Sequence, residues 1–309
     1  MKHALVTGGA GFIGSHIVDR LVADGCRVRV LDDFSTGKME NLAGAGDVEV
    51  IRGDIGDPET VNNAMASIDL VFHQAAIASV PRTIEDPPGS QRTNYQGTLN
   101  ILEAARQSAV KRVVFASSAA VYGDDPTLPK TEDMIPRPQS PYAVDKLASE
   151  YACLTYYHLY GLETVCLRYF NVYGPRQDPS SPYSGVISIF ADRLKNNIQP
   201  VIFGDGEQTR DFIYISDVVD ANLHAANEYA AVGEVFNVAT GVQVSLNDLL
   251  KVMAGIYEGD AKPVYKKSRA GDIRHSLAAI EKGIVVLKQV PGVKLGEGLG
   301  IFLDVDVCK

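Results

Sequence analysis

The sequence has few cysteines and no long apolar run. Its 309 residues include four cysteines, Cys26, Cys153, Cys166 and Cys308, which lie far apart without a Cys-x-x-Cys pair. This pattern indicates neither a zinc site nor a disulfide framework. No apolar run reaches the ~20 residues that a membrane span requires, and the first one meets Gly8 too early for the core of a signal peptide. We therefore expect no metal, no membrane partner and a cytoplasmic location.

Positive charge is also scarce. The chain has 29 Lys and Arg against 38 Asp and Glu, a formal net charge of −9. This balance disfavours attraction to phosphate backbones or anionic lipid, so we expect no nucleic-acid partner. The hydrophobic fraction of 46% is enough for a sizeable core. The composition therefore favours one large domain or two interleaved ones and excludes a disordered or fibrous protein.

Short apolar runs alternate with segments of helical period over the first 170 residues. Ile13, Ile17 and Leu21 recur every four residues and predict a crossover helix after the first strand. This alternation is typical of an α/β protein with a Rossmann-type doubly wound parallel sheet. The strand candidates are residues 4–6, 28–31, 48–51, 70–72, 113–115 and 165–167.

Two longer helices are expected at residues 94–107 and 142–160, the second opened by Ser140 as N-cap and by a proline at the first helical position. After Phe170 the pattern loosens into turns rich in glycine and proline, which indicates a smaller second lobe. We therefore divide the chain into residues 1–168 and residues 169–309. Two strand-like segments of the second part, 212–215 and 235–238, are candidates to return to the main sheet.

A glycine-rich segment, TGGAGFIG at residues 7–14, follows the first strand candidate and opens the first helix candidate. In this context Gly8 allows the tight turn, Gly11 lets backbone approach a pyrophosphate, and Gly14 lets helix and strand close. The N-terminus of the helix attracts the phosphates. The combination predicts dinucleotide binding, although a lone glycine triplet would indicate only a turn.

Acidic residues follow the second and third strand candidates. Asp32 stands at the end of the second strand, where a carboxylate can bind the ribose hydroxyls of adenosine. Asp33 stands beside it, and two carboxylates with no arginine directly after them favour NAD over NADP. Asp54 is a candidate for the adenine edge. Exposed turns would explain the same residues, but with the glycine loop they predict that residues 1–168 form a NAD-binding Rossmann domain.

A tyrosine and a lysine, Tyr142 and Lys146, are four residues apart and therefore share one face of the helix that Ser140 begins. A tyrosine titrates near ~10 and becomes a base near neutrality only where cations stabilise the phenolate. Lys146 and the helix N-terminus both act in that direction. Ser117 and Ser118 directly follow a strand candidate, at the edge where doubly wound folds bind ligands. Taken alone, the tyrosine and lysine would indicate only a solvated helix face, and the two serines would indicate only a helix cap.

Five motifs together carry a resemblance to a known family. They are TGGAGFIG at 7–14, SSAAVYG at 117–123, YAVDK at 142–146, RYFNVYGP at 168–175 and RDF at 210–212. In this combination and order they resemble the extended short-chain dehydrogenase/reductases, specifically the UDP-hexose 4-epimerases, over roughly residues 2–278. The resemblance implies NAD as cofactor and a UDP-sugar as substrate. It implies interconversion of UDP-glucose and UDP-galactose, and also of UDP-GlcNAc and UDP-GalNAc, through a transient 4-keto intermediate.

The resemblance also implies roles for individual residues. Tyr142 would be the catalytic base, Lys146 would hold the nicotinamide ribose, and Ser118 would contact the sugar hydroxyl. Contacts with the cofactor would come from Gly8, Gly11, Phe12, Ile13, Gly14, Asp32, Asp33, Ser35, Thr36, Gly37, Asp54, Ile55, Ala75, Ala76, Ala78, Asn94, Ser117, Tyr142, Lys146 and Tyr169. Besides Ser118 and Tyr142, substrate contacts would come from the substrate-binding lobe, residues 169–309, through Asn171, Val186, Arg210, Arg269, Asp272 and Ser276.

Other reactions remain open at this point. Related sugar-nucleotide 4,6-dehydratases carry an acid directly after the serine pair, where this chain has two alanines, so elimination of the 6-hydroxyl is disfavoured. A UDP-glucuronate 4-epimerase needs a cation near the sugar carboxylate, and the sequence does not place Arg82, Arg92 or Arg176 relative to it. A non-catalytic NAD-binding regulator is a further alternative, because a fold alone does not imply turnover.

Two more expectations follow from the resemblance. The helices at 94–107 and 142–160 correspond to those that pair into a four-helix dimer interface in the family, so we expect a homodimer with Leu147, Tyr151 and Leu154 as apolar contacts. Packing against the sheet would explain the same side chains. A serine at position 276 leaves room for an acetamido group where a bulky tyrosine would exclude it.

Overall fold

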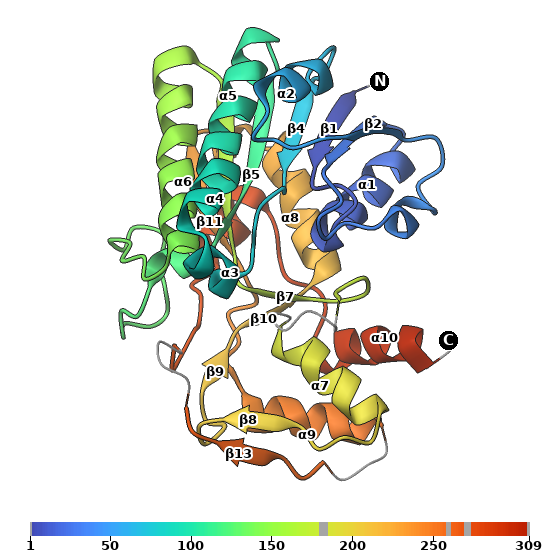
Figure 1. Ribbon diagram of the computed structural model, residues 1–309. Helices are drawn as coiled ribbons and strands as arrows, with labels where there is room; N and C mark the ends of the chain where they lie inside the picture. Colours follow the sequence, from blue (N-terminus) through green and yellow to red (C-terminus); the bar gives the residue numbers. More distant parts are fainter. Residues whose placement is uncertain (1, 179–184, 258–260, 269–272, 308–309) are drawn as a thin grey trace.

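A seven-stranded parallel sheet forms the larger part of the molecule (Figure 1). The computed structural model describes residues 2–178, 185–257, 261–268 and 273–307. In order across the sheet, the strands are β11 Glu234–Val238, β6 Glu163–Tyr169, β5 Arg112–Ser118, β4 Leu70–His73, β1 His3–Thr7, β2 Arg27–Asp32 and β3 Glu49–Arg52. The strand order reverses between β1 and β4, and such a switch point is where doubly wound folds bind ligands. The Rossmann-type fold expected from the sequence is confirmed.

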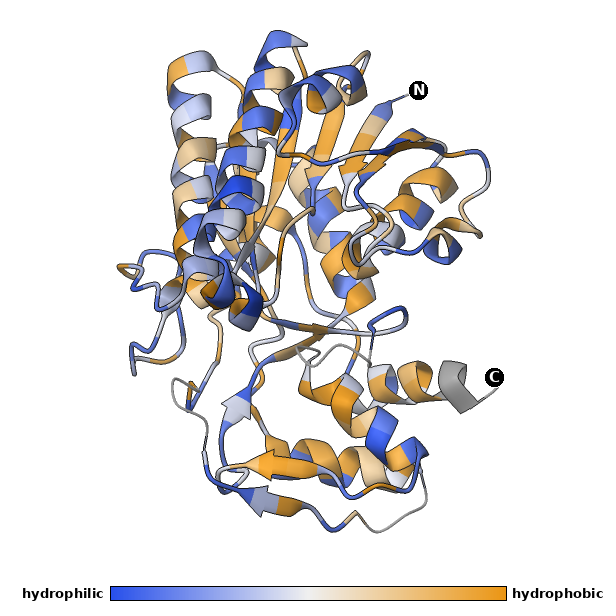
Figure 2. Cartoon of the chain, in the orientation of Figure 1, coloured by the Kyte–Doolittle hydropathy of each residue, from blue (hydrophilic) through white to orange (hydrophobic). Residues whose placement is uncertain are grey.

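Helices cover both faces of this sheet because its strands are apolar on both sides (Figure 2). In β1, Ala4 and Val6 join the cluster that includes Ile17 of one flanking helix, whereas Leu5 points to the other face and joins Ile101. One face carries α1 Phe12–Ala23 and α8 Ile215–Asn227, and the other carries α2 Pro58–Ala64, α5 Gly97–Gln107 and α6 Pro141–Tyr160. The short elements of this part are η1 Met39–Leu42, α3 Val80–Glu85, α4 Pro87–Gln91, the π-helical turn η2 Arg92–Gln96, and η3 Ala119–Tyr122.

The smaller lobe lies at the end of the sheet where the strands finish (Figure 1). Its strand pairs are β7 Asn171–Tyr173 with β10 Phe212–Tyr214, β8 Val201–Phe203 with β13 Val264–Lys266, and β9 Thr209–Arg210 with β12 Val244–Ser245. Its helices are α7 Val186–Lys195, α9 Leu246–Ile256 and α10 Leu295–Val307. The remaining turns, η4 Tyr229–Ala231 and η5 Gly283–Leu287, pack against each other. Of the two candidate returning strands, residues 235–238 join the sheet within β11, whereas β10 pairs with β7 outside it.

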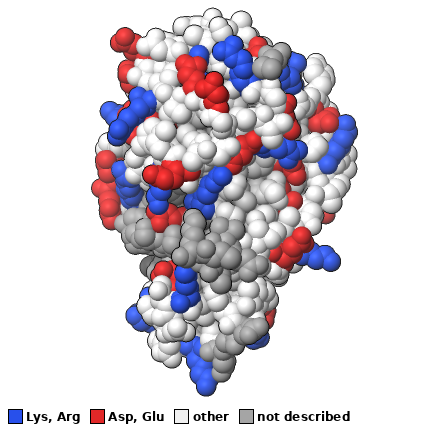
Figure 3. Space-filling view, turned by 90° about the vertical axis from the view of Figure 1, so that its right-hand side faces the viewer, with Lys and Arg blue, Asp and Glu red and all other residues white. Residues whose placement is uncertain are grey.

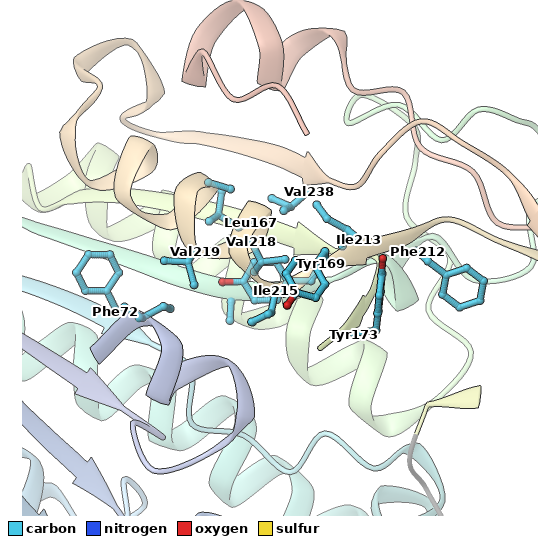
Figure 4. Close-up of a cluster of buried hydrophobic side chains, with 14 of the residues drawn as sticks. Phe72, Leu167, Tyr169, Tyr173, Phe212, Ile213, Ile215, Val218, Val219 and Val238 are labelled. Carbon is cyan, nitrogen blue, oxygen red and sulfur yellow. The ribbon is translucent and has the colours of Figure 1, made fainter. Parts of the chain in front are cut away.

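A continuous apolar core joins the two parts. Tyr169 at the end of β6 and Val218 of α8 lie in the same buried cluster as Tyr173 and Phe212 from the smaller lobe (Figure 4). Leu299 and Phe302 of α10 are buried in this cluster as well. Because the core is shared, the second lobe is held in one orientation over the carboxyl edge of the sheet.

Two surface properties bear on partners. Lys and Arg side chains are interspersed with Asp and Glu on the face drawn in Figure 3. Within the described ranges, no helix is both long and apolar enough to cross a membrane.

Candidate active site

The glycine loop forms a tight turn between β1 and α1. Gly8 has a φ of +66°, which an L side chain rarely adopts. A Cβ on Gly14 would lie 2.1 Å from the carbonyl oxygen of Gly8, so only glycine allows the helix to start this close to the strand. Gly11 is the N-cap of α1. The loop therefore leaves backbone N–H groups at a helix N-terminus, an arrangement that binds phosphate.

Asp32 ends β2 with its carboxylate held by backbone. Its Oδ2 accepts a hydrogen bond of 2.9 Å from the Ala10 N–H in the glycine loop, and its Oδ1 accepts one of 2.8 Å from Phe34. Burial raises the pKa of Asp32, and these two hydrogen bonds lower it. Gly37 packs against this group, because a Cβ there would lie 2.8 Å from Asp32 Oδ1. The neighbouring Asp33 accepts hydrogen bonds from the backbone and hydroxyl of Ser35.

A cavity of about 580 Å³ runs from this loop to the start of α6. The predicted residues that line it are Gly8, Gly11, Phe12, Ile13, Gly14, Asp32, Asp33, Ser35, Thr36, Asp54, Ile55, Ala75, Ala76, Ala78, Ser117, Tyr142, Lys146 and Tyr169. Gly37 and Asn94 do not line it: Gly37 supports Asp32, and the side chain of Asn94 is bound to the backbone of Ile77. Its walls include a phosphate-binding loop, the acidic end of β2 and a Tyr–Lys pair, which are the groups that would hold the pyrophosphate, the adenosine ribose and the nicotinamide end of NAD.

Sequence reasoning missed part of the cavity wall. The additional lining residues are Leu31, Gly53, Gln74, Ile77, Arg82, Asp86, Gly89, Arg92, Thr93 and Ala116. Gln74 directly follows β4 and Ala116 lies two residues before the end of β5, so the rule that ligands bind at the carboxyl ends of the strands could have found them. Arg82 and Arg92, whose positions the sequence left open, belong to the short helical segments beside α6. Arg92 pairs with Asp54 at 2.5 Å, and Arg176 pairs with Asp19 at 2.7 Å.

The Tyr–Lys pair lies at the N-terminal end of α6, where the hydroxyl of Ser140 accepts a hydrogen bond from a backbone N–H of the first turn as predicted. The Nζ of Lys146 donates to the carbonyl oxygen of Ala116 at 2.6 Å and lies 5.9 Å from the centre of the Tyr142 ring. Burial lowers the pKa of Lys146 to about 8. The lysine is therefore poised to change charge close to neutral pH.

The phenol of Tyr142 is subject to two opposing effects. Burial raises its pKa from the ordinary value near 10, and a hydrogen bond with Ser118 lowers it. The cations expected to depress this pKa are therefore opposed by burial of the phenol, which the local sequence does not reveal. Ser118 itself ends β5, and its Oγ accepts a hydrogen bond from the backbone of Ala120. The arrangement can bind a hydroxyl group between Ser118 and Tyr142 and transfer its proton.

Of the candidate substrate residues of the second lobe, the four that the structure describes do not line the 580 Å³ cavity: Asn171, Val186, Arg210 and Ser276. The amide of Asn171 donates to the backbone carbonyl of Asp211 at 3.0 Å. Arg210 donates to the carbonyl of Thr209 at 2.8 Å, and the backbone N–H of Ser276 donates to the same carbonyl at 3.1 Å. The fold therefore brings Arg210 and Ser276 together. Val186 is the first residue of α7, and Arg269 and Asp272 lie outside the described residues.

The glycine loop, the acidic end of β2 and the Tyr–Lys pair at a switch point define an extended short-chain dehydrogenase/reductase. Comparison with known proteins agrees: the family model described as "NAD dependent epimerase/dehydratase family" matches residues 4–239. The chain belongs to this family.

Individual relatives match over almost the whole chain. A UDP-glucose 4-epimerase of Mycolicibacterium smegmatis is 42% identical over 301 residues, which cover 96% of this chain and 95% of the relative. The solved structure of UDP-N-acetylglucosamine 4-epimerase from Methanobrevibacter ruminantium, in complex with UDP-N-acetylmuramic acid, has a TM-score of 0.95 and 39% identity, covering 99% of this chain and 98% of that one. The Thermus thermophilus UDP-glucose 4-epimerase in complex with NAD has a TM-score of 0.90 and 39% identity, with 98% of both chains covered.

Proposed function

We propose that this protein is a NAD-dependent isomerase that interconverts the 4-epimers of UDP-hexoses. The substrates are UDP-glucose and UDP-galactose and also UDP-GlcNAc and UDP-GalNAc. The observation that carries the proposal is the hydrogen-bonded pair of Ser118 and Tyr142 beside Lys146, at the end of a cavity that begins with a phosphate-binding loop. The family match and the named relatives support the same reaction.

In the proposed mechanism the protein moves a proton and orients the sugar. Tyr142 as phenolate accepts the proton of the 4-hydroxyl, while Ser118 orients that hydroxyl by hydrogen bonding. Lys146 contributes the positive charge that stabilises the phenolate. NAD, held by the glycine loop and the carboxylate of Asp32, would supply the hydride chemistry at C4 that inverts the configuration there. Tyr142 then returns the proton, so that only the configuration at C4 has changed.

The surroundings of Ser118 favour epimerisation over elimination. The two following residues, Ala119 and Ala120, begin the turn η3 and carry no acid or base. Loss of the 6-hydroxyl would need a general acid and a general base near C5 and C6. The serine–alanine–alanine sequence therefore supports return of the hydride to the 4-ketone.

The acetylated substrates are proposed on the basis of Ser276. This half-buried residue is hydrogen-bonded through its backbone to Thr209, which directly precedes Arg210. Arg210 is the proposed ligand of the diphosphate, so a residue beside it can border the sugar. A serine leaves more room there than a tyrosine would, which favours tolerance of an acetamido group.

A cation for a sugar carboxylate would support a UDP-glucuronate 4-epimerase instead. Arg92 is paired with Asp54, and Arg176 with Asp19, so both guanidinium groups already have an anionic partner. Arg82 lines the cavity and is the arginine that this alternative would require. A non-catalytic regulator is disfavoured by the intact arrangement of Ser118, Tyr142 and Lys146.

One experiment separates these functions. Purified protein is incubated separately with UDP-glucose, UDP-GlcNAc and UDP-glucuronate, the epimers are resolved by chromatography, and absorbance at the NADH band is followed. We expect epimers of the first two sugars without NADH accumulation. Turnover of UDP-glucuronate alone would establish the alternative epimerase, stoichiometric NADH would establish a dehydrogenase, and no turnover with retained NAD would establish a regulator.

We also propose a role for each of the two parts of the chain, a homodimeric assembly and a cytoplasmic location. Residues 1–168 bind NAD and residues 169–309 bind the sugar nucleotide, with β11 of the second part completing the sheet.

The protein is a homodimer formed through α5 and α6, supported by Tyr151 on α6, which is 57% exposed. Light scattering coupled to size-exclusion chromatography tests this. A cytoplasmic location is supported by the cysteine pattern, which provides no disulfide framework.

A further inference from the structure

Asp145 is a buried carboxylate in the catalytic helix that the proposed mechanism does not use. It directly precedes Lys146 in α6 and is only 6% exposed. It does not line the cavity that would hold the cofactor. Burying a carboxylate is costly unless hydrogen bonds and a cation compensate. The groups around Asp145 therefore indicate what it does.

Its hydrogen-bond partners come from the cavity wall. The hydroxyl of Ser90, in α4, donates to Asp145 Oδ2 at 2.5 Å, and the side chain of Asn94, in the π-helical turn η2, also hydrogen-bonds to the carboxylate. Asn94 in turn donates to Ser90 Oγ at 3.2 Å and accepts from the Ile77 N–H at 2.7 Å. Ile77 lines the cavity, as do Gly89, Arg92 and Thr93 on either side of Ser90 and Asn94. The carboxylate thus connects the catalytic helix to one wall of the cofactor site.

Several ionisable groups surround Lys146, and they do not affect its charge equally. From α6 it faces Asp145, Glu150, Cys153 and Tyr142, and from β6 it faces Cys166. His73 of β4 also lies close, and burial lowers the pKa of that imidazole to about 3, so it is neutral near neutral pH.

The two carboxylates in this group differ in their cations. Glu150 is neutralised by a two-point ion pair with Arg168. For Asp145, the cation that acts on it is Lys146 itself. Asp145 therefore supplies the negative charge that is not already balanced by another residue.

We propose that Asp145 is a positioning residue for the Tyr142–Lys146 pair, which ties α6 to the Ser90–Asn94 wall and keeps the Lys146 ammonium charged. The part of this proposal that concerns turnover rests on the proposed epimerase function. The part that concerns the charge of Lys146 does not. The two effects of Asp145 can be tested separately. The tether depends on the hydrogen bond from Ser90, whereas the effect on the charge of Lys146 depends only on the carboxylate of Asp145.

The charge is tested with Asp145→Asn, which keeps the shape of the side chain. The titration of Lys146 is followed by NMR of ¹³Cε-labelled lysine in the NAD-loaded protein, with the resonance assigned by its loss in Lys146→Ala. We expect Asp145→Asn to move the pKa of Lys146 down by about one pH unit. The alkaline limb of kcat/KM for UDP-glucose should move down by the same amount.

Two matched variants separate tether and charge. Ser149→Ala removes a buried hydrogen bond of 3.2 Å from α6 to the carbonyl of Asn94 without changing a charge, so the pKa of Lys146 should stay at the wild-type value. Ser90→Ala removes the 2.5 Å hydrogen bond of the tether but leaves the carboxylate, so kcat should fall severalfold with the same alkaline limb.

Different results would contradict the two parts of the proposal. An unchanged pKa of Lys146 in Asp145→Asn, or the same displacement in Ser149→Ala, would overturn the charge effect. Wild-type kcat in Ser90→Ala would overturn the tether. If the wild-type protein epimerises no UDP-sugar, the proposed function fails, but the NMR titration still decides whether Asp145 holds the charge of Lys146.

Discussion

Glu150 and Arg168 form a buried two-point ion pair beneath the active site. The Nε and one terminal nitrogen of Arg168 donate to the two carboxylate oxygens of Glu150 at 2.9 and 2.8 Å, and both side chains are almost fully buried. Ser117, which lines the cavity, also donates a hydrogen bond to Glu150. The pair therefore connects α6 and β6 directly behind the groups that are proposed to react.

The first prediction concerns this pair. Glu150→Gln leaves the Arg168 guanidinium buried without its counter-charge, so we expect the free energy of unfolding to fall by about 3–5 kcal/mol. Urea denaturation followed by circular dichroism measures the loss. Glu234→Gln is the matched control, because Glu234 is exposed and pairs with Lys282 at 2.7 Å, so the midpoint should barely move. An equal loss of unfolding free energy in the two variants would show that burial does not make the Glu150–Arg168 pair more important for stability.

The second prediction assigns the base. Tyr142→Phe removes the hydroxyl that transfers the proton, so kcat should fall by about 10²–10⁴-fold. Calorimetric titration should show near-wild-type affinity for UDP-glucose, because the lost hydroxyl contributes little to anchoring the nucleotide. Near-wild-type kcat in this variant would show that another group is the base.

The third prediction is a pH dependence. Burial lowers the pKa of Lys146 to about 8, so the lysine loses its proton and its charge as the pH rises through this value. We expect kcat/KM to decline above pH about 8, because the phenolate of Tyr142 then lacks its stabilising cation. In Lys146→Ala the residual activity should appear only at higher pH than in the wild type. A pH profile identical in shape to the wild type would contradict this assignment.

The fourth prediction concerns substrate size. Ser276→Tyr places a bulky ring where the acetamido group is proposed to lie, so kcat/KM for UDP-GlcNAc should fall ~10–200-fold relative to UDP-glucose. Ser276→Ala serves as control, since it leaves the space open and should retain both substrates. Unchanged selectivity in the tyrosine variant would remove Ser276 from substrate selection.

The fifth prediction concerns stability in acid. His73 is buried between the hydroxyls of Thr7 and Thr98, and burial lowers its pKa to about 3. Between pH ~6.5 and 3 the unfolded chain therefore binds a proton that the folded chain does not, and stability rises with pH. His73 should contribute a loss of about 1.4 kcal/mol per pH unit on acidification in this window. His73→Gln should show a shallower dependence in urea titrations at several pH values; parallel curves would contradict it.

Local sequence patterns were sufficient for the strands, the crossover helix and the glycine loop. The turn at Gly8 and the helix start at Gly14 depend on backbone geometry over eight residues, and the spacing of Tyr142 and Lys146 on one helix face depends on the helical repeat. Ser140 as N-cap is a property of the same few residues. Contacts with residues distant in the chain add little to the prediction of such local features.

The sequence by itself determined the doubly wound fold, the dinucleotide loop and the Tyr–Lys pair, because each is encoded within one strand, turn or helix. Only the tertiary structure decided that Arg92 meets Asp54, that Ser276 lies beside Arg210, and that β11 rather than β10 completes the sheet. These relationships join segments tens of residues apart. Their outcome depends on how all the buried surfaces and hydrogen bonds are satisfied together, which no short stretch of sequence specifies.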